Sequence, residues 1–352
     1  MEIFIKQLKK QLLQEFRNQD RKGIYAYTQK NMAYNSNKIE GSTLTSEQTA
    51  SLFDTGTMMM SGDLVYRTKD VEEMTGHFKM FNEVLKNLDK PLTSDMIKSF
   101  HYQLKSGVFE DYANGYPIGE FKSRANQVSD IVTEKPQNIP DRIENLIQWY
   151  NSSEKKLADI ARFHAEYEHI HPFQDGNGRT GRAVILKQCL DSDIIPVIIS
   201  NDDKTAYYHA LHTAQVEGDY EKLLTFFKKS QDKYYEHVKK FIIMPTEKTE
   251  KASKIMNGFA ALLKTKNFVN ESQIVVCDLP DAVRCFVRNN SSMIMIDFLQ
   301  YEITIALNSN IVTPDELKER DEKIREIYKK TISTLKEYMD ECSNAGFEKY
   351  FE

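Results

Sequence analysis

The spacing of apolar residues follows the α-helical period along most of the chain. This spacing predicts helices at residues 1–20, 24–40, 70–88, 154–170, 178–190, 203–217, 219–243 and 313–343. Capping signals predict further helix starts at Thr45, Thr93 and Pro140. Glycine and proline are scarce, at 14 and 9 of 352 residues, so few positions break these helices. The pattern therefore predicts a mainly α fold.

Two stretches depart from the helical pattern. Residues 106–138 hold several glycines and prolines around the sequence FKSRANQVSDIV, which predicts a β-hairpin or extended flap. Residues 270–310 are mixed, with strand-like runs at 274–277 and 293–299. Pro245 ends the last helix before this mixed region, and a lysine-rich stretch follows it.

These breaks divide the chain into three parts. We expect N-terminal helices over residues 1–69 and a helical core with the flap over residues 70–244. Residues 245–352 are expected to form a mostly helical extension that can include short strands.

Composition narrows the class of protein. The chain is 40% hydrophobic and 28% charged, as expected for a globular protein with a sizeable core. A net charge of −5 argues against a nucleic-acid-binding surface over the whole chain. The N-terminus lacks a signal-peptide pattern, and no apolar run approaches a membrane span. The four cysteines are scattered, which favours reduced thiols, and we expect a cytoplasmic protein without membrane partners.

The segment His171–Arg182, HPFQDGNGRTGR, lies between two predicted helices and carries the clearest chemistry. Gly176 and Gly178 let the backbone turn tightly and approach a ligand, and N–H groups at a helix start bind anions. Arg179 and Arg182 are three residues apart, so both can project from the first turn of one helix. Two guanidinium groups beside such a loop indicate a polyphosphate rather than a single carboxylate.

Three other side chains complete this segment. Asp175 stands at the mouth of the loop, where a carboxylate beside phosphates usually holds Mg²⁺. His171 precedes the loop, where an imidazole could take a proton from an incoming hydroxyl. Phe173 lies between polar neighbours and is expected to point inward and fix the loop. Together these residues predict nucleotidyl or phosphoryl transfer, and the alternative is a structural helix–loop–helix with a surface histidine.

The same segment resembles the Fic family signature, H-P-F-x-[D/E]-G-N-G-R-x-x-R, at all nine fixed positions. The surrounding resemblance runs from about residue 24 to residue 243 and implies a helical Fic core with a small β-hairpin flap. It implies a protein adenylyltransferase that transfers AMP from ATP to a Ser, Thr or Tyr hydroxyl of a target protein and releases pyrophosphate. Related kinase-like toxins carry lysine at the position of Gly178, which argues against their chemistry here.

The resemblance also implies individual roles. His171 would be the base that deprotonates the target hydroxyl, and Asp175 would coordinate Mg²⁺ between the α- and β-phosphates. The remaining ATP-binding residues would be Phe173, Asn177 with the backbone of Gly176 and Gly178, and Arg179 and Arg182 for the β- and γ-phosphates.

A second short motif lies near the N-terminus. Residues 36–41, SNKIEG, fit the family's inhibitory pattern [S/T]-x-x-x-E-[G/N]. Ser36 and Glu40 are four residues apart and share a helix face, and a glutamate there could pair with an arginine of the site. The resemblance names Arg182 as that partner, which implies an enzyme held inactive by its own N-terminal helix. An ordinary solvated helix end is the alternative.

Other residues admit two interpretations. Tyr207 and Tyr208 could line the adenine pocket, as aromatic residues near this point do in relatives, or could pack in the core. His164 is expected to be a packed helix histidine rather than a zinc ligand.

The predicted flap could pair with an extended target segment by strand addition. The residues assigned to this docking role are Gly119, Lys122, Asn126 and Val128, although Lys122 could simply be solvated.

Three functions remain open from the sequence. The first is a self-inhibited protein adenylyltransferase that acts on other proteins and can modify itself. The second is related chemistry on the same scaffold, such as AMP removal, in which Glu40 would align water. The third is a non-enzymatic binding or regulatory module, against which the intact His171 argues. Residues 245–352 could select targets, form a homodimer or cap the core.

Overall fold

The computed structural model divides the chain into two compact units, Met1–Ile242 and Ile243–Glu352, each with its own hydrophobic core. The structure describes residues 2–58, 67–128, 131–242, 244–289, 292–307, 310–314, 316, 322–341, 346–347 and 350–351. For Gln127, Val128 and Ile131 it describes the backbone and not the side chain.

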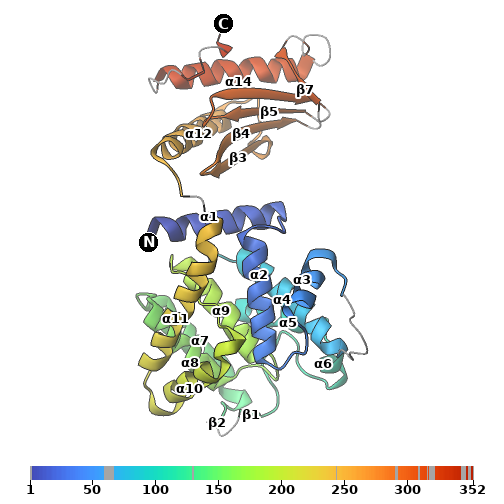
Figure 1. Cartoon of the computed structure of the whole chain (residues 1–352), viewed down its shortest axis with the longest axis vertical. Coiled ribbons are helices and arrows are strands. Elements are labelled where there is room, and N and C mark those ends of the chain that lie inside the picture. The colour runs from blue at the N-terminus through green and yellow to red at the C-terminus, as the bar shows by residue number, and fades with distance from the viewer. Residues whose placement is uncertain are drawn as a thin grey trace. The chain divides into compact units, whose positions relative to one another are not determined.

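The first unit is built from helices (Figure 1). Its α-helices are α1 Glu2–Asn18, α2 Ile24–Ile39, α3 Ser46–Thr55, α4 Thr68–Lys86, α5 Ser94–Lys105, α6 Phe109–Ala113, α7 Ile139–Ser152, α8 Leu157–Ile170, α9 Asn177–Asp191, α10 Lys204–Glu217 and α11 Glu221–Val238. Short 3-10 turns lie at Pro136–Asn138, Asn201–Asp203 and Lys239–Phe241. The mainly α prediction is confirmed.

Side chains set several helix starts where the sequence predicts them. The Thr45 hydroxyl accepts a hydrogen bond from the Gln48 N–H, and the Gln48 side chain accepts one from the Thr45 N–H. The Thr93 hydroxyl accepts from the Met96 N–H in the same way. These bonds satisfy N–H groups that the first turn of a helix leaves without backbone partners.

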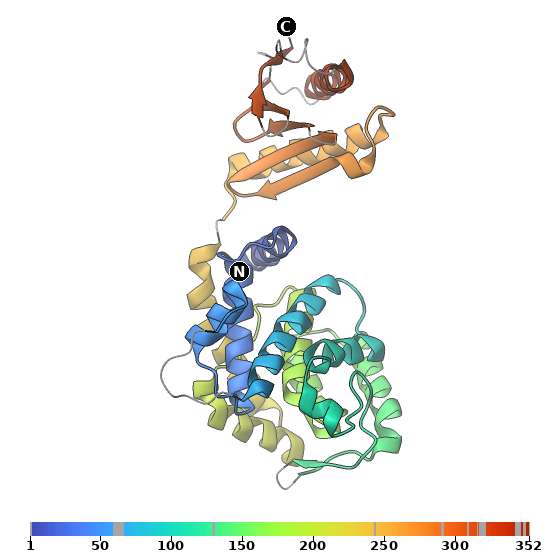
Figure 2. The same cartoon turned by 90° about the vertical axis from the view of Figure 1, so that its right-hand side faces the viewer.

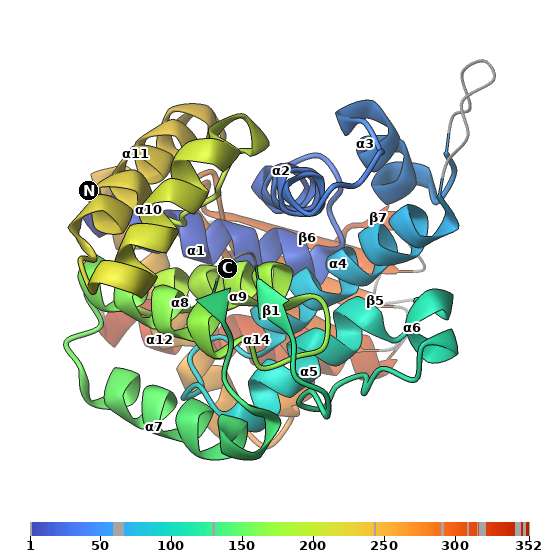
Figure 3. The same ribbon diagram turned by 90° about the horizontal axis from the view of Figure 1, so that it is seen from below.

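Helix α9 lies at the centre of the first unit and contacts α2, α4, α5 and α8. Nearly all of its residues are buried, from Asn177 to Leu190, so no face of this helix is left to solvent. Figure 3 shows α2 end-on, with α3 and α4 to one side and α10 to the other. The central position of α9 places its N-terminus, where the motif ends, inside the helical core.

The flap is smaller than the sequence suggests. Strands β1, Gln127–Val128, and β2, Ile131–Val132, pair antiparallel as a two-stranded hairpin. The rest of residues 106–138 includes the short helix α6, which the glycine and proline content did not predict.

The second unit has a sheet that the sequence only partly predicts (Figure 2). Strands β3 Ile274–Leu279, β4 Ala282–Asn289, β5 Ser292–Asp297, β6 Glu302–Leu307 and β7 Asn310–Val312 form an antiparallel sheet in sequence order. Helices α12, Glu247–Thr265, and α14, Glu322–Glu341, contact each other, and residues of both helices and of the sheet share one core. The strand-like runs at 274–277 and 293–299 belong to β3 and β5, whereas β4, β6 and β7 were not predicted.

The break between the two compact units lies beside Pro245, near the boundary drawn from the sequence. Among the described helices, none has the length and apolar character needed to cross a membrane.

Candidate active site

The motif loop connects α8 to α9 through two left-handed backbone positions. Helix α8 ends at His171, whose φ is 53°, and α9 begins after Gly176, whose φ is 84°. A non-glycine residue such as His171 adopts this conformation at an energetic cost, and such residues concentrate at functional sites. The first backbone hydrogen bond of α9 runs from the Thr180 N–H to the Gly176 carbonyl. The N–H groups before Thr180 therefore lie at the open end of the helix, where anions bind.

Phe173 and Asn177 hold the loop in this shape. The Phe173 ring is fully buried and stacks on His101, with ring centroids 3.9 Å apart and planes 2° from parallel. The Asn177 amide accepts from the Phe173 N–H at 2.7 Å and donates to the Phe173 carbonyl at 2.8 Å. Both polar atoms of this buried side chain therefore bind the loop backbone, and the assignment of Asn177 to the phosphates stays a prediction.

His101 of α5 fixes the loop from the other side. The Gly119 N–H donates to its Nδ1 at 3.0 Å, so the ring proton is on Nε2, which donates to the Asp175 carbonyl at 3.0 Å. Burial lowers the pKa of His101 to about 3, so the ring stays neutral and keeps this tautomer at physiological pH. His101 therefore links Gly119, at the base of the flap, to Asp175, the predicted metal ligand.

His171 is neutral at physiological pH. Its Nδ1 lies 3.4 Å from the Glu168 carbonyl, which can only accept, so the ring proton is on Nδ1 and Nε2 is the basic nitrogen. Burial and the nearby charge of Lys122 lower the pKa of His171 to about 4. A neutral imidazole can accept a proton, as a general base must.

Asp175 and Arg179 belong to a buried ionic network. The Lys105 ammonium lies 2.6 Å from Glu73, 2.7 Å from Asp111 and 2.8 Å from Asp175. The Arg179 guanidinium lies 2.6 Å from Glu73 and 3.6 Å from Asp175. Burial alone would raise the pKa of the Asp175 carboxyl, but Lys105 and Arg179 outweigh it and hold that pKa below its ordinary value. The carboxyl is therefore ionised throughout the physiological range.

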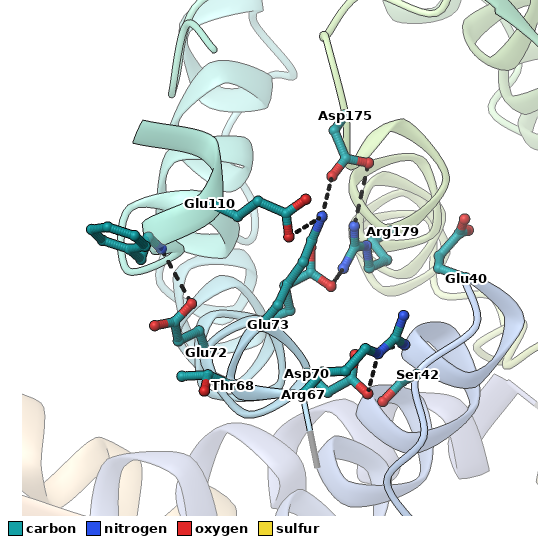
Figure 4. A pocket seen from close by; sticks show the side chains of 12 residues that line it. Glu40, Ser42, Arg67, Thr68, Asp70, Glu72, Glu73, Glu110, Asp175 and Arg179 are labelled. Atoms are coloured by element: carbon teal, nitrogen blue, oxygen red, sulfur yellow. Dashed lines mark hydrogen bonds and ion pairs between the residues drawn. The ribbon is translucent and has the colours of Figure 1, made fainter. Parts of the chain in front are cut away.

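A cavity of about 610 Å³ opens beside this network (Figure 4). Its walls come mainly from α4 and the start of α6, and Glu40, Asp175 and Arg179 also line it. The Asp175 side chain keeps 36% of its surface exposed. Figure 4 shows Asp175 and Arg179 side by side, with Glu40 on the end of α2 beyond them.

Arg182 is bound by the end of α2. Its Nε donates to the Ser36 hydroxyl at 2.8 Å, and its Nη2 donates to the Ser36 carbonyl at 3.0 Å and to the Glu40 carboxylate at 2.7 Å. The Arg182 side chain is only 4% exposed, whereas Glu40 keeps 31%. Burial opposes the charge of Arg182, but Glu40 outweighs it and the pKa of the guanidinium is raised. The two short motifs of the sequence therefore meet.

Gly178 makes room for this contact. A Cβ placed on Gly178 would lie 2.5 Å from the Glu40 Oε1 and 3.0 Å from the Arg182 Nη1. Both distances are shorter than ordinary van der Waals contact, so the carboxylate occupies the space that a side chain would fill.

Tyr207 and Tyr208 of α10 differ in how far their side chains are exposed. Tyr207 is 1% exposed and its hydroxyl lies 2.7 Å from the His164 Nε2, which agrees with core packing for both residues. Tyr208 is 40% exposed and its ring centroid lies 5.2 Å from that of Tyr207. Of the pair, only Tyr208 presents a ring at the surface.

The flap residues attach the hairpin to the motif loop. The Lys122 ammonium donates to Asn126 at 2.7 Å and to Thr133 at 2.8 Å, and its backbone N–H donates to the Pro172 carbonyl at 2.8 Å. The Asn126 amide donates to the Phe173 carbonyl at 3.3 Å. Lys122 is 2% exposed, which corrects its interpretation as a solvated residue, and burial lowers its pKa to about 8. The side chain of Val128 lies outside the described residues.

Asp175 has the properties of a Mg²⁺ ligand. Its carboxylate is ionised, partly exposed and turned to a cavity beside an arginine and a helix N-terminus. These residues fit a metal ion that arrives with phosphates, which would supply its other oxygen ligands.

The sequence analysis missed Lys105 and Glu73. Lys105 follows His101 by four residues and therefore lies on the buried face of α5, where a lysine is unexpected. Glu73 follows Asp70 and precedes His77 on α4, and all three side chains are buried. A charged residue on the apolar face of a predicted helix was the signal that could have identified both.

The motif loop and the two arginines of α9 lie in a segment that matches a known protein family. Residues 91–189 match the model of the Fic/DOC family, so the chain carries a Fic domain.

Similar proteins include protein adenylyltransferases. The protein adenylyltransferase Fic of Nematostella vectensis is 28% identical over 197 residues, which cover 55% of this chain and 44% of that protein. The protein of the same name from Aedes aegypti is 29% identical over 55% of this chain and 38% of its own length. The matched segment thus spans less than half of either relative.

Solved structures share the fold. A Fic-domain-containing signaling protein from Bacteroides thetaiotaomicron has a TM-score of 0.53 at 24% identity, over 67% of this chain and 95% of that protein. Fic-1 from C. elegans has a TM-score of 0.51 at 20% identity, over 67% of this chain and 72% of the solved chain.

Proposed function

We propose that this chain is a protein adenylyltransferase, which transfers AMP from ATP to a hydroxyl of a target protein, and that its own helix α2 holds it inactive. The observation that carries the proposal is the engagement of Arg182 by Ser36 and Glu40 beside an otherwise complete anion-binding loop. Named relatives with this activity support the transferase assignment.

The chemistry follows from the side chains. The basic Nε2 of His171 takes the proton of the target hydroxyl, whose oxygen attacks the α-phosphorus of ATP while pyrophosphate leaves. Arg179, Arg182 and the N–H groups at the start of α9 bind the phosphates. A Mg²⁺ ion held by Asp175 would neutralise charge on the phosphates when bound. The reaction therefore depends mainly on positioning and on stabilising charge.

Inhibition follows from competition for one guanidinium group. Arg182 cannot donate to the Glu40 carboxylate and to a terminal phosphate through the same N–H groups. The Arg182 Nη1 has no hydrogen-bond partner among the described residues, but the Glu40 carboxylate lies close to it beside Gly178 and would keep a phosphate away. The protein as it stands is therefore a weak ATP binder with a complete active site.

The test replaces the inhibitory glutamate. Glu40→Gly removes one charge-assisted hydrogen bond to Arg182, so AMP incorporation and ATP affinity are expected to rise by about tenfold or more. The measurement is transfer of labelled AMP to proteins of a lysate and to the chain itself.

His171→Ala is the matched control for this test. In the Glu40→Gly background it should abolish transfer and leave ATP binding within about threefold, because the base contributes to the chemical step and not to phosphate binding. Equal labelling by the wild-type chain and the Glu40→Gly variant would reject the inhibitory role, and labelling by the His171→Ala variant would reject the base.

A second function on this site is AMP removal. The Glu40 carboxylate is partly exposed and lines the cavity beside Arg179, so it could align a water molecule for hydrolysis of an AMP-modified hydroxyl. Incubation of the wild-type chain with a pre-AMPylated protein distinguishes the two, because AMP release that is lost in the Glu40→Gly variant would favour removal.

The partner is a protein that presents a flexible hydroxyl. Hairpin β1–β2 leaves Val132 76% exposed, and strand addition at this hairpin would hold an extended target segment without a strict sequence requirement. Self-modification and homodimer formation stay proposals that the same labelling experiment and a mass measurement in solution would test.

A further inference from the structure

We propose that the ammonium group of Lys105 is a resident cation for Asp175, which orients that carboxylate and makes metal binding depend on the nucleotide. The role of this contact in metal binding rests on the proposed function, but the geometry of the contact does not depend on any substrate. Lys105 acts through Asp175 and is therefore a positioning residue.

Three carboxylates from separate elements converge on this one nitrogen. Glu73 comes from α4, Asp111 from α6 and Asp175 from the motif loop, at 2.6, 2.7 and 2.8 Å from the Lys105 Nζ. The side chains of Lys105 and Asp111 are each 1% exposed. Buried like charges at such separations repel strongly, so the three carboxylates can share this point only around a cation.

The ammonium occupies the point on which the three carboxylates converge. Oxygen ligands surround Ca²⁺ at about 2.3–2.6 Å and Mg²⁺ at about 2.0–2.1 Å, so the oxygens at 2.6, 2.7 and 2.8 Å from Lys105 would have to move inward to hold either ion. Lys105 therefore fills this point in place of a metal.

Nearby cations offset most of the local negative charge. The three carboxylates face Lys105, the Arg179 guanidinium at 2.6 Å from Glu73, and the Lys69 ammonium, which lies 3.9 Å from Asp175 and 3.3 Å from Glu110. Little uncompensated negative charge therefore remains in this cluster to draw a divalent ion from water. The phosphates of ATP supply that charge, so the metal enters with the nucleotide.

The hydrogen bond from Lys105 also orients the Asp175 carboxylate for metal binding. Its Oδ2 accepts from Lys105, and its Oδ1 accepts from the Gly176 N–H at 2.7 Å. A carboxylate has about four lone-pair positions, so two bonds leave others free. Since 36% of the side chain is exposed, the free positions face the cavity, and Lys105 fixes the plane in which they lie.

The test measures Mn²⁺ binding without any nucleotide, by calorimetry and by the Mn²⁺-dependent rise in melting temperature. Lys105→Met is expected to bind Mn²⁺ at least about tenfold more tightly than the wild-type chain, in line with changes of 10–100-fold when groups beside metal ligands are altered. Its melting temperature should fall without metal and recover when Mn²⁺ is added.

Lys187→Met is the matched control. Lys187 is also 1% exposed and pairs with one carboxylate, that of Asp191, but lies near the far end of α9. This variant should lose stability and gain no Mn²⁺ affinity, because one carboxylate is not a metal site.

A second variant keeps the test informative if Lys105→Met alone does not fold. Lys105→Met combined with Asp111→Asn leaves only two carboxylates, Glu73 and Asp175, both close to Arg179, and should show an intermediate Mn²⁺ affinity. The proposal is overturned if neither variant binds Mn²⁺ more tightly than the wild-type chain, or if Lys187→Met gains as much. A gain in Mn²⁺ affinity with no AMP transfer by Glu40→Gly would reject the transferase and leave the role of Lys105 standing.

Discussion

Burial and the nearby charge of Lys122 keep the His171 imidazole neutral, as its proposed role of general base requires. Its Nδ1 proton is directed to the Glu168 carbonyl, and the pKa near 4 keeps Nε2 free of a proton at neutral pH. A weak base suffices here, because the arginines and the helix N-terminus stabilise the charge that develops on the phosphates.

This environment predicts an unusual pH dependence. Because the pKa of His171 is lowered from 6.5 to about 4, the base loses its function only as pH falls towards 4. The kcat/KM of the Glu40→Gly variant, measured with excess Mg²⁺, is therefore expected to show no acid limb centred near pH 6.5. An acid limb with that midpoint would contradict both the buried environment and the assigned role.

At the scale of elements, the proposed inhibition depends on how closely α2 approaches α9. The end of α2 supplies Ser36 and Glu40, and the first turn of α9 supplies Gly178 and Arg182. The absence of a side chain at position 178 is what lets the carboxylate reach the guanidinium. Glycine here has a packing role besides any contact of its backbone with phosphates.

Gly178→Ala tests this role. The new Cβ would lie 2.5 Å from the Glu40 Oε1, at the end of a flexible side chain, so we expect the carboxylate to move away at little cost in stability. ATP affinity, measured by calorimetry, should rise by up to about tenfold, the gain expected when a charge-assisted bond is lost.

The decisive comparison is the double variant. In the Glu40→Gly background, Gly178→Ala should have no further effect, because both changes act on the same contact. A loss of ATP affinity in both backgrounds would show instead that the methyl group obstructs the phosphates.

At the scale of the whole molecule, the two units have separate cores. The first unit contains the site residues and ends at Ile242, and the core of the second unit consists of residues from Ala252 to Phe347. Helices close the first core, whereas an antiparallel sheet and two helices close the second. The catalytic proposal concerns the first unit alone.

This separation predicts that residues 1–242 fold without the rest of the chain. The fragment carrying Glu40→Gly should unfold in one cooperative thermal transition and bind ATP within about threefold of the full-length variant, because distant independent regions contribute separately. Calorimetry measures both quantities. Aggregation of the fragment, or loss of ATP binding, would show that residues 243–352 complete the site.

Local patterns identified the helices and the motif, because helix period, capping residues and glycine-rich loops act over a few neighbouring residues. Thr45, Thr93 and the segment from His171 to Arg182 illustrate this. The sheet of the second unit was largely missed, because pairing between β4 and its neighbours depends on contacts with other strands rather than on the residues of β4 alone.

The amino-acid sequence was enough to predict the helical class and to identify the two motifs that meet in the structure, since each is encoded in adjacent residues. Only the tertiary structure showed that Asn177 and Lys122 bind backbone and side chains inside the protein, and that Lys105 stands among three carboxylates. The longest of these contacts joins Lys105 to Asp175, 70 positions away along the chain. Whether a buried polar group faces a ligand or another residue depends on the packing of several elements, which no short pattern contains.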